Sequence, residues 1–381
     1  MKIALVKRRY SLKHGGSERY CVNLARRLKT VGHDVTVIGE RIDEELASEV
    51  DFVPVRVSRL TSSTRNRSFA ENCGKAARQG RFDVVYGLGR AFGLDAVRVT
   101  ERLQSHWVNV YYRNWANRSL QRMNPRHRTL IGLERTIYRS SSVRRIVTQS
   151  RLDRKLVVEH YGIPEEKIRT IYNGVDTNVF HPDVRDASSE VRESLGVSAD
   201  EPLFVFASMD FEGKGLRSIL DALSRIRDKD AKLLVLGIGP ERKFARIAHS
   251  HGVGHRVIFA GRRNDIQKYY GAGDLFLLPT AYEPFPNVNL EAMACGLPAM
   301  TTVTNGGADV IEEGRNGYLI SSVHAVDEIA DHLDGHLRLS SSRRDEMAAA
   351  CWSTAQSLTV EENVRKTLDV FEEILLEKNR V

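Results

Sequence analysis

The chain has 381 residues, of which 41% are hydrophobic and 28% are charged, and its formal net charge is +8 at pH 7. This length exceeds one ordinary hydrophobic core, so we expect two domains of a soluble globular protein. No stretch is long and apolar enough to span a bilayer, and the first strand, Met1–Val6, runs into Lys7-Arg8-Arg9 instead of forming a signal peptide.

The cysteines indicate neither disulfides nor a metal site. They are scattered without metal-ligand spacing, and each lies among apolar or small residues: Cys21, Cys73, Cys295 and Cys351. We therefore expect reduced, packed thiols in a cytoplasm. Asp and His residues form no cluster with metal-ligand spacing either, so no metal ion is expected.

Positive charge is concentrated in the N-terminal half. Residues 1–190 contain 35 Lys and Arg against 21 Asp and Glu, whereas residues 191–381 contain 22 against 28. The arginines are densest between Arg98 and Lys155, at Arg102, Arg113, Arg118, Arg122, Arg126, Arg128, Arg135, Arg139, Arg144 and Arg145. Solvated helix faces are the ordinary explanation of such a run, but a field this one-sided attracts a polyanion or an anionic membrane surface.

The first predicted elements form a βαβ unit. A buried strand, 2–6, precedes a loop with Gly15 and Gly16, then a helix whose apolar positions share one face up to Gly32, then strand 34–39. The two glycines suit a close approach of backbone to a ligand. A dehydrogenase is poorly supported, because G-x-G-x-x-G is absent even though Glu40 ends the second strand.

Four further strands are predicted at 52–57, 82–86, 96–99 and 145–148. The loops 87–90 and 100–107 follow two of them and are candidates for the wall of a ligand site. Within the second loop, Glu101 and His106 are the candidate ligand contacts, although lone loop residues are usually just solvated. The following segment, Arg113–Ser142, combines arginines with aromatics, which suits a membrane interface or single-stranded nucleic acid. No nucleic-acid motif accompanies it, so no nucleic-acid partner is expected.

The first domain is predicted to end soon after helix 150–161 and strand 168–172, and the polar segment 183–189 is expected to be a hinge. Strands and helices then alternate again, with strands at 203–207, 233–236, 257–261 and 275–279 and helices at 216–227, 308–313 and 360–376. Lys214 follows the first of these strands and stands at the start of the next helix, between Gly213 and Gly215. An ammonium group at this place can bind a phosphate. The alternative is an ordinary surface lysine.

The segment from Tyr282 to Pro298 carries the strongest functional signal. It follows an apolar strand, and from Asn287 it has helical periodicity that stops at Gly296-Leu297-Pro298. Glu283 precedes this helix and Glu291 lies within it. The helix amino end suits a diphosphate, and the two carboxylates can accept hydrogen bonds from sugar and ribose hydroxyls, which is the pattern of a nucleotide-sugar site.

This segment resembles the signature of glycosyltransferase family 4. In that signature two Glu residues are separated by seven others, and an Ala-Met-Ala-Cys-Gly-Leu-Pro-like sequence follows the second Glu. Within the family, the chain most resembles the lipopolysaccharide core glucosyltransferases, through Asp210-Phe211, Lys214-Gly215 and Glu134-Arg135. The resemblance implies an α/β protein of the GT-B fold, with two Rossmann-like domains facing across a cleft. The expected domains are an acceptor-binding domain at 1–182, a nucleotide-sugar-binding domain at 190–358, and a C-terminal helix, 359–381, that crosses back to domain one.

The resemblance also implies roles for individual residues. Lys214 pairs with the diphosphate, Glu291 binds the ribose, and Glu283 acts at the sugar or reaction centre. Gly15 and Gly16 meet the donor phosphate and the acceptor, Arg262 faces the base, and backbone N–H groups of Phe285, Asn287 and Val288 hold the hexose and β-phosphate. Many relatives have a His that contacts the transferred sugar where this chain has Thr100-Glu101, so Glu101 or His106 is the candidate there.

The chain departs from the family pattern at two positions. Relatives usually carry an Arg shortly before the lysine, but Gly213 stands there, so Arg242, Lys243, Arg262 or Arg263 is left to supply the second cation. Many relatives have Gly at position 286, whereas Pro286 has no N–H to donate. Both departures concern how the donor is held.

From these residues we expect a retaining, metal-independent transfer of a hexose from a nucleotide sugar, with UDP as the expected nucleotide and no cofactor. The acceptor is expected to be a cell-envelope saccharide or glycolipid such as lipopolysaccharide core. The basic N-terminal domain would hold a cytoplasmic enzyme peripherally against the anionic inner face of the membrane. The alternatives are a non-catalytic nucleotide-sugar-binding or envelope-binding protein, a nucleotide-sugar epimerase and, with less support, a basic nucleic-acid-binding protein.

Overall fold

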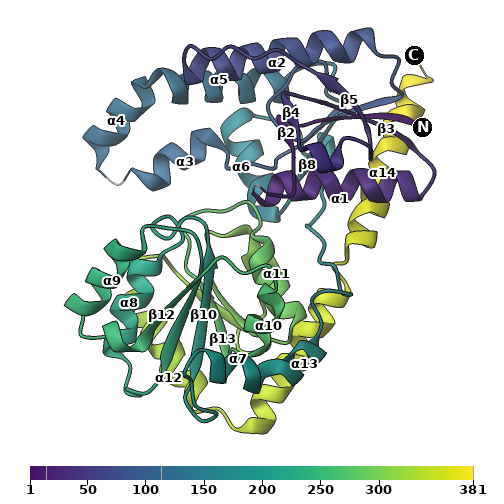
Figure 1. Ribbon diagram of the computed structural model, residues 1–381. Helices are drawn as coiled ribbons and strands as arrows, with labels where there is room; N and C mark the ends of the chain where they lie inside the picture. Colours follow the sequence, from purple (N-terminus) through teal and green to yellow (C-terminus); the bar gives the residue numbers. More distant parts are fainter. Residues whose placement is uncertain (14, 113, 381) are drawn as a thin grey trace. The chain divides into compact units, whose positions relative to one another are not determined.

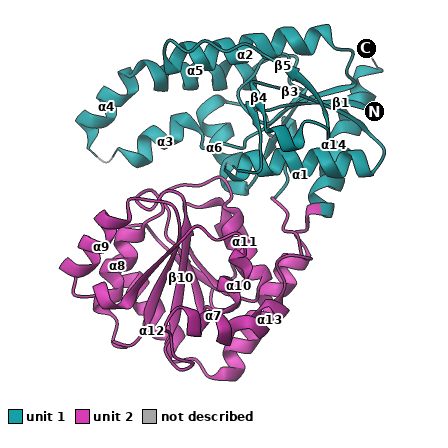
Figure 2. Cartoon of the chain, in the orientation of Figure 1, with its two compact units in different colours: residues 1–172, 361–381 teal, residues 173–360 magenta. Residues whose placement is uncertain are grey.

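The structure is a computed structural model that describes residues 1–13, 15–112 and 114–380. Arg113, one of the arginines of the basic run, lies outside the described residues. The chain forms two compact units, which we call unit 1 (residues 1–172 and 361–381) and unit 2 (residues 173–360; Figure 2). Each unit is an α/β layer structure in which helices cover a parallel sheet (Figure 1).

Unit 1 is built on a seven-stranded sheet with the order β5-β3-β1-β6-β7-β8-β9, and each pairing is parallel. The strands are β1 Lys2–Val6, β3 Asp34–Gly39, β5 Asp51–Pro54, β6 Val84–Gly87, β7 Ala96–Arg98, β8 Arg145–Thr148 and β9 Ile168–Thr170. The apolar runs of β1 and β6 are buried, as a sheet covered on both faces requires. Successive strands add on one side of β1 up to β5, and the chain then returns to the other side of β1 with β6.

The helices of unit 1 follow the predicted alternation with strands. They are α1 Gly16–Thr30, α2 Ser62–Gln79, α3 Gln104–Tyr111, α4 Trp115–Met123, α5 Pro125–Tyr138, α6 Arg151–Tyr161 and most of α14 Val360–Lys378. Short elements are β2 Arg9–Tyr10, β4 Arg41–Ile42, η1 Glu44–Leu46 and η2 Glu165–Lys167. The predicted helix at 150–161 is confirmed as α6, since the Ser150 side chain accepts a hydrogen bond from the Asp153 N–H and Gly162 ends the helix with φ +61°.

The C-terminal helix returns to unit 1, as predicted. Phe371 of α14 is fully buried and meets the Tyr86 ring edge-on, with ring centroids 5.1 Å apart. Glu373 accepts hydrogen bonds from Arg145 Nε and Arg169 Nη2, both at 2.8 Å. Apolar contact and a shared carboxylate therefore hold the helix to unit 1.

Unit 2 is built on a six-stranded parallel sheet with the order β12-β11-β10-β13-β14-β15. The strands are β10 Leu203–Ser208, β11 Lys232–Gly237, β12 Val257–Gly261, β13 Leu275–Leu278, β14 Ala299–Thr302 and β15 Gly317–Ile320. The helices are α7 Ser188–Ser194, α8 Leu216–Arg225, α9 Glu241–Ser250, α10 Ile266–Gly271, α11 Asn287–Ala294, α12 Val326–Leu337 and α13 Ser341–Gln356, with η3 Pro182–Ala187, η4 Gly254–Arg256 and η5 Gly306–Val310. One buried apolar cluster fills the space between this sheet and its helices.

Two predictions about local structure are wrong. The segment 183–189, expected to be a hinge, folds as η3 and the start of α7, because Val184 packs so closely on α10 that a Cβ on Gly271 would lie 2.7 Å from the Val184 carbonyl oxygen. The helix expected at 308–313 is instead the 3₁₀ turn η5. It begins earlier because the Asn305 side chain caps the Gly307 N–H, and it ends at Ile311, whose backbone is extended.

All four cysteine thiols are free and buried, as predicted. Burial raises the pKa of Cys21, Cys73 and Cys295 to about 12, so these thiols stay protonated at neutral pH.

Candidate functional site

Two opposite charges meet at the strand-order reversal of unit 2. The strands β10, β11 and β12 extend the sheet in one direction, and β13 then begins the other side next to β10. In open α/β sheets the crevice outside the carboxyl ends of such a pair is the usual ligand site. Lys214 follows β10 and Glu283 follows β13, and Lys214 Nζ lies 2.5 Å from Glu283 Oε2.

Local backbone geometry explains why Lys214 reaches this point. Gly215 has φ +83°, and a Cβ on it would lie 2.3 Å from the Pro279 carbonyl oxygen, so only glycine lets this loop lie against the end of β13. The fully buried Thr280 donates a hydrogen bond to the Gly213 carbonyl oxygen at 3.1 Å. The residue after Gly213 is therefore fixed beside the segment that leads to Glu283.

The amino end of α11 lies next in sequence to this ion pair. Asn173 Nδ2 donates to Asn287 Oδ1 at 2.6 Å and to the Phe285 carbonyl oxygen at 3.3 Å, which holds the start of the helix. The first N–H groups of a helix have no intrahelical partner, and here they belong to Asn287, Val288 and their neighbours. Glu291 is half-buried one turn further on, on the same side of the helix as Asn287, and is not part of the Lys214–Glu283 pair.

A pocket of about 170 Å³ opens beside the Lys214 loop. Its walls come from Phe211 in the loop after β10, from β11 and β12, and from the residues that follow these two strands, and its charged lining residues are Glu241 and Arg262. Gly237, one of the lining residues, lets the ends of β10 and β11 lie close together, because a Cβ there would lie 1.8 Å from the Ser208 carbonyl oxygen. Arg262, predicted to face a base, lines this cavity. Phe211, from the loop that holds Lys214, lines it as well.

The position directly before Lys214 is Gly213, so it supplies no second cation. Asp210 Oδ1 accepts a hydrogen bond from the Gly213 N–H at 2.9 Å, and a Cβ on Gly213 would lie 2.2 Å from Asp210 Oδ2. Lys243 is bound at 2.5 Å to Glu212, which lowers the pKa of that carboxyl group. The guanidinium of Arg263 lies 5.3 Å from the centre of the Tyr269 ring. Of the four replacements considered, Arg262 is the one that lines the pocket.

The predicted residues of unit 1 lie at the corresponding edge of its own sheet. Gly15 is the N-cap of α1 and Gly16 its first residue. The side chain of Lys7, which follows β1, is 97% buried and donates to Ser17 Oγ in the first turn of α1 at 2.8 Å. An ammonium group that the sequence did not single out therefore lies beside the predicted glycine loop.

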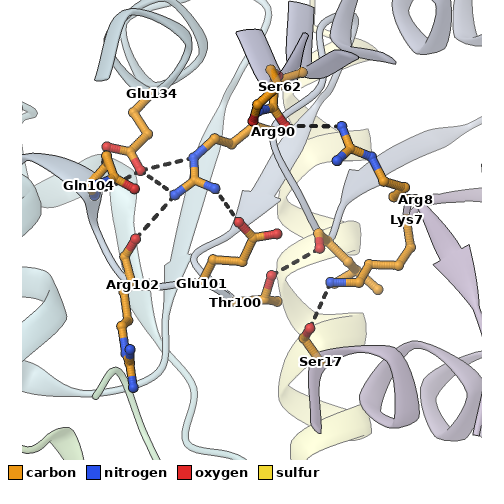
Figure 3. Close-up of polar contacts among 12 residues, drawn as sticks. Lys7, Arg8, Ser17, Ser62, Arg90, Thr100, Glu101, Arg102, Gln104 and Glu134 are labelled. Atoms are coloured by element: carbon orange, nitrogen blue, oxygen red, sulfur yellow. Dashed lines mark hydrogen bonds and ion pairs between the residues drawn. The ribbon is translucent and has the colours of Figure 1, made fainter. Parts of the chain in front are cut away.

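Glu101 belongs to a chain of charges that Figure 3 shows. Arg90 Nη1 is hydrogen-bonded to Glu101 Oε2, while Arg90 Nε and Nη2 donate to Glu134 Oε1 at 2.9 and 2.6 Å. Partial desolvation raises the pKa of the Glu101 carboxyl group, but attraction to Arg90, Lys7 and Arg8 outweighs it, and the pKa is lowered overall. Glu101 is therefore ionised at neutral pH.

His106 lies elsewhere and has a different environment. Its Nδ1 is 3.4 Å from His160 Nε2, and the two rings meet edge-on. Burial and the neighbouring His160 lower the pKa of His106 to about 4, so its imidazole is neutral at pH 7. The structure thus brings Glu101, but not His106, into the Arg90 cluster.

Arg90 lies in the loop 87–90, which the sequence predicts to line a site, but neither Arg90 nor Glu134 was singled out as a site residue. They are 44 positions apart, and only the packing of α5 against the loop after β6 brings them together. The one available signal was an acid in an apolar helical stretch, since Glu134 follows Leu133 and is fully buried in α5.

Metal sites and membrane-spanning helices are both absent from the described residues. In residues 1–13, 15–112 and 114–380, no group of three or more His, Cys, Asp or Glu side chains could hold a metal ion. Over the same residues, none of the helices combines the length and apolarity needed to cross a bilayer.

Comparison with known proteins shows the family. Residues 14–179 match the sequence model described as "Glycosyltransferase Family 4", and residues 187–350 match "Glycosyl transferases group 1". Together these two matches span most of the chain. The chain belongs to glycosyltransferase family 4.

Individual relatives agree with this assignment. The chain is 24% identical to the lipopolysaccharide glucosyltransferase WaaG of Escherichia coli K12, over 84% of this chain and 85% of WaaG. It is 33% identical to N-acetyl-alpha-D-glucosaminyl L-malate synthase of Bacillus anthracis, but this match spans only 41% of either protein.

Solved structures of other proteins share the fold. A crystal structure of WaaG superimposes with a TM-score of 0.83 at 23% identity, covering 97% of this chain and 99% of that one. HepE of Anabaena, solved in complex with UDP-glucose, superimposes with a TM-score of 0.75 at 19% identity, covering 98% and 100%. The GT-B fold expected from the sequence is thereby confirmed.

Proposed function

We propose that this glycosyltransferase moves a hexose from a UDP-linked donor, with retention of configuration, to a saccharide or lipid-linked acceptor of the cell envelope such as lipopolysaccharide core. The observation that carries the proposal is the Lys214–Glu283 pair at the strand reversal of unit 2, next in sequence to the start of α11. These are the two kinds of charge that an activated sugar requires, a cation for its diphosphate and a carboxylate for its hydroxyl groups.

The donor is proposed to bind along the carboxyl edge of unit 2. The base and ribose would occupy the 170 Å³ pocket lined by Glu241 and Arg262, with Glu291 accepting from the ribose hydroxyls. The diphosphate would lie between Lys214 and the first N–H groups of α11, where the helix dipole favours negative charge. UDP is supported as the nucleotide by the complexes of HepE with UDP and UDP-glucose.

The chemistry follows from where charge develops. As the bond between the hexose and the diphosphate breaks, negative charge grows on the leaving phosphate, and Lys214 would neutralise it. Glu283 would orient the hexose through its hydroxyl groups, and Arg262 would supply the cation that Gly213 cannot. An ammonium group, a guanidinium group and a helix amino end would then do the work of a metal ion.

The acceptor and the membrane are proposed to meet unit 1. In Figure 1, α3 and α4 extend away from the sheet of this unit. No side chain of α4 is buried, and Trp115, Leu120 and Met123 are 79%, 61% and 68% exposed, with Arg118 and Arg122 on the same helix. An apolar stripe flanked by arginines suits the interface of an anionic membrane, so a peripheral location at the cytoplasmic face is proposed.

The donor proposal is tested by thermal shift with UDP-, GDP- and ADP-glucose. A ligand at 100 times its Kd stabilises the folded protein by about 2.7 kcal/mol, so the nucleotide that fits raises the melting temperature most. We expect the largest shift with UDP-glucose and its loss in Glu291→Ala. Equal shifts with all three sugars, or a full shift in the variant, would contradict the assignment.

A non-catalytic nucleotide-sugar-binding protein is the second candidate, because Gly213 stands where relatives have an arginine. UDP-glucose binding without UDP release, with or without an acceptor, would favour it.

A further inference from the structure

Unit 1 repeats the strand reversal that carries the donor-site residues in unit 2. Its strand order turns back between β1 and β6, just as that of unit 2 turns back between β10 and β13. The residues that follow these two strands are charged, with Lys7 and Arg8 after β1 and Arg90 in the loop after β6. A second ligand crevice is therefore expected at this edge.

The charges at this edge are organised around a fully buried carboxylate, Glu134. It accepts hydrogen bonds from two nitrogens of Arg90, from the Gln104 N–H at 3.0 and 3.1 Å, and from the Tyr161 hydroxyl. Burying a carboxylate costs several kcal/mol unless its oxygens are satisfied, and here both oxygens have donors. Glu134 therefore holds Arg90 in one position and orientation.

Arg90 in turn fixes a carboxylate that faces solvent. Its Nη2 also donates to the Arg102 carbonyl oxygen at 3.1 Å, and its remaining terminal nitrogen, Nη1, binds Glu101 (Figure 3). Glu101 is 47% exposed although Arg90 is only 14% exposed. In the part of the chain that the structure describes, Glu101 has one hydrogen bond, to Oε2, so Oε1 remains available for a ligand.

Stability alone does not account for this arrangement, because an ion pair with a half-exposed partner contributes little. A fixed, ionised carboxylate with a free oxygen accepts hydrogen bonds from hydroxyl groups. We propose that Glu101 binds a saccharide hydroxyl group and that Arg90 and Glu134 are the positioning residues that hold it for this task. This inference rests on the proposed function, in which two saccharides, the transferred hexose and the acceptor, bring hydroxyl groups to the enzyme.

Isothermal titration of the full chain tests the inference with three probes. UDP alone measures the nucleotide site, UDP-glucose adds the hexose, and a deacylated, phosphorylated core oligosaccharide of lipopolysaccharide represents the acceptor. Glu101→Gln should weaken binding about tenfold, as expected for one hydrogen bond to a charged group. The loss should appear either in the affinity that UDP-glucose gains over UDP or in the affinity for the oligosaccharide. The arm that changes identifies which saccharide Glu101 binds.

Glu165→Gln is the matched control, since Glu165 is an exposed carboxylate of unit 1 bound to Arg154 at 2.9 Å outside the cluster. It should change neither arm. Arg90→Lys should reproduce part of the Glu101→Gln loss while the melting temperature shows that the protein is folded. It should also shift the loss of saccharide binding to higher pH, because Arg90, with Lys7 and Arg8, keeps Glu101 ionised.

The inference is overturned if Glu101→Gln binds both saccharides like the wild type, if the wild type gains nothing from either saccharide, or if UDP binding falls equally. An unchanged Glu101→Gln variant leaves the donor proposal standing. That proposal fails separately if the wild type binds no UDP sugar.

Discussion

Lys214 and Glu283, 69 residues apart in sequence, form an ion pair with 2.5 Å between Nζ and Oε2. Their side chains are only 12% and 24% exposed, so the pair is poorly hydrated and its charges act strongly on anything placed beside them. Without a donor the two groups neutralise each other. In the proposed mechanism, the ammonium group of Lys214 binds the diphosphate and the carboxylate of Glu283 binds the hexose hydroxyl groups, so the ion pair is replaced by contacts to the donor.

Replacing Lys214 with Ala should therefore abolish most activity. We expect UDP release from saturating UDP-glucose to fall about 100-fold or more, the usual loss when one group that stabilises developing charge is removed. Lys243→Ala is the control, because Lys243 is also bound to a glutamate at 2.5 Å but is 46% exposed. Equal losses in both variants would assign Lys214 a general electrostatic role and not one at the phosphate.

Pro286→Ala should strengthen donor binding. Pro286 is the N-cap of α11 with φ −77°, so alanine can adopt the same backbone while adding one N–H at the proposed phosphate and hexose site. We expect about a threefold to tenfold gain in UDP-glucose affinity, the worth of one hydrogen bond. The unfolded chain gains freedom, which lowers stability by about 0.5–1 kcal/mol. An unchanged affinity with this small loss of stability would show that residue 286 does not meet the donor.

The stability given by α14 should depend on pH. Desolvation raises the pKa of Glu373, but hydrogen bonds from Arg169 and Arg145 outweigh it and lower the pKa below its ordinary value. A carboxyl group with a lowered folded-state pKa stabilises the protein above its unfolded-state pKa, and this contribution is lost as the pH falls through the folded-state value. Thermal unfolding of Glu373→Gln should show a melting temperature about 2 °C below wild type at pH 7, as for a partly exposed pair.

That difference should shrink as the pH is lowered through 4, where the wild-type carboxylate also begins to bind protons. Glu372→Gln is the control, since Glu372 is the exposed neighbour on the same helix. A difference that persists unchanged at pH 3 would mean that the variant repacks α14 and does not merely lose the charge.

Much of the candidate site in unit 2 could be predicted because it depends on local patterns. The apolar runs of β10 and β13 and the glycines beside Lys214 are visible in the sequence, so both charged residues could be assigned to carboxyl-end loops. That the two loops are neighbours depends on the order of strands, which no local pattern contains. The same limit concealed the Arg90–Glu134 contact, which joins a loop to a helix 44 residues away.

The wrong predictions have the same origin. The segment 183–189 looks like a linker because it is polar, yet it folds because the missing side chain of Gly271 lets Val184 approach α10. The polar composition of such a segment indicates only that much of it is exposed to solvent. Whether it folds depends on its tertiary packing, which the composition does not show.

Leu120→Gln should weaken binding to anionic vesicles. Leu120 is 61% exposed on α4, between Trp115 and Met123, so a membrane interface could bury it. Loss of about half of the transfer free energy of a leucine side chain predicts about a fivefold to tenfold weaker partition into phosphatidylglycerol-containing vesicles. Leu376→Gln is a close control, because Leu376 is also 61% exposed but lies on α14. Co-sedimentation at low and high salt measures both variants, and the arginines of α4 predict weaker binding at high salt for every form. If the two leucine variants bind alike, α4 is not the surface that meets the membrane.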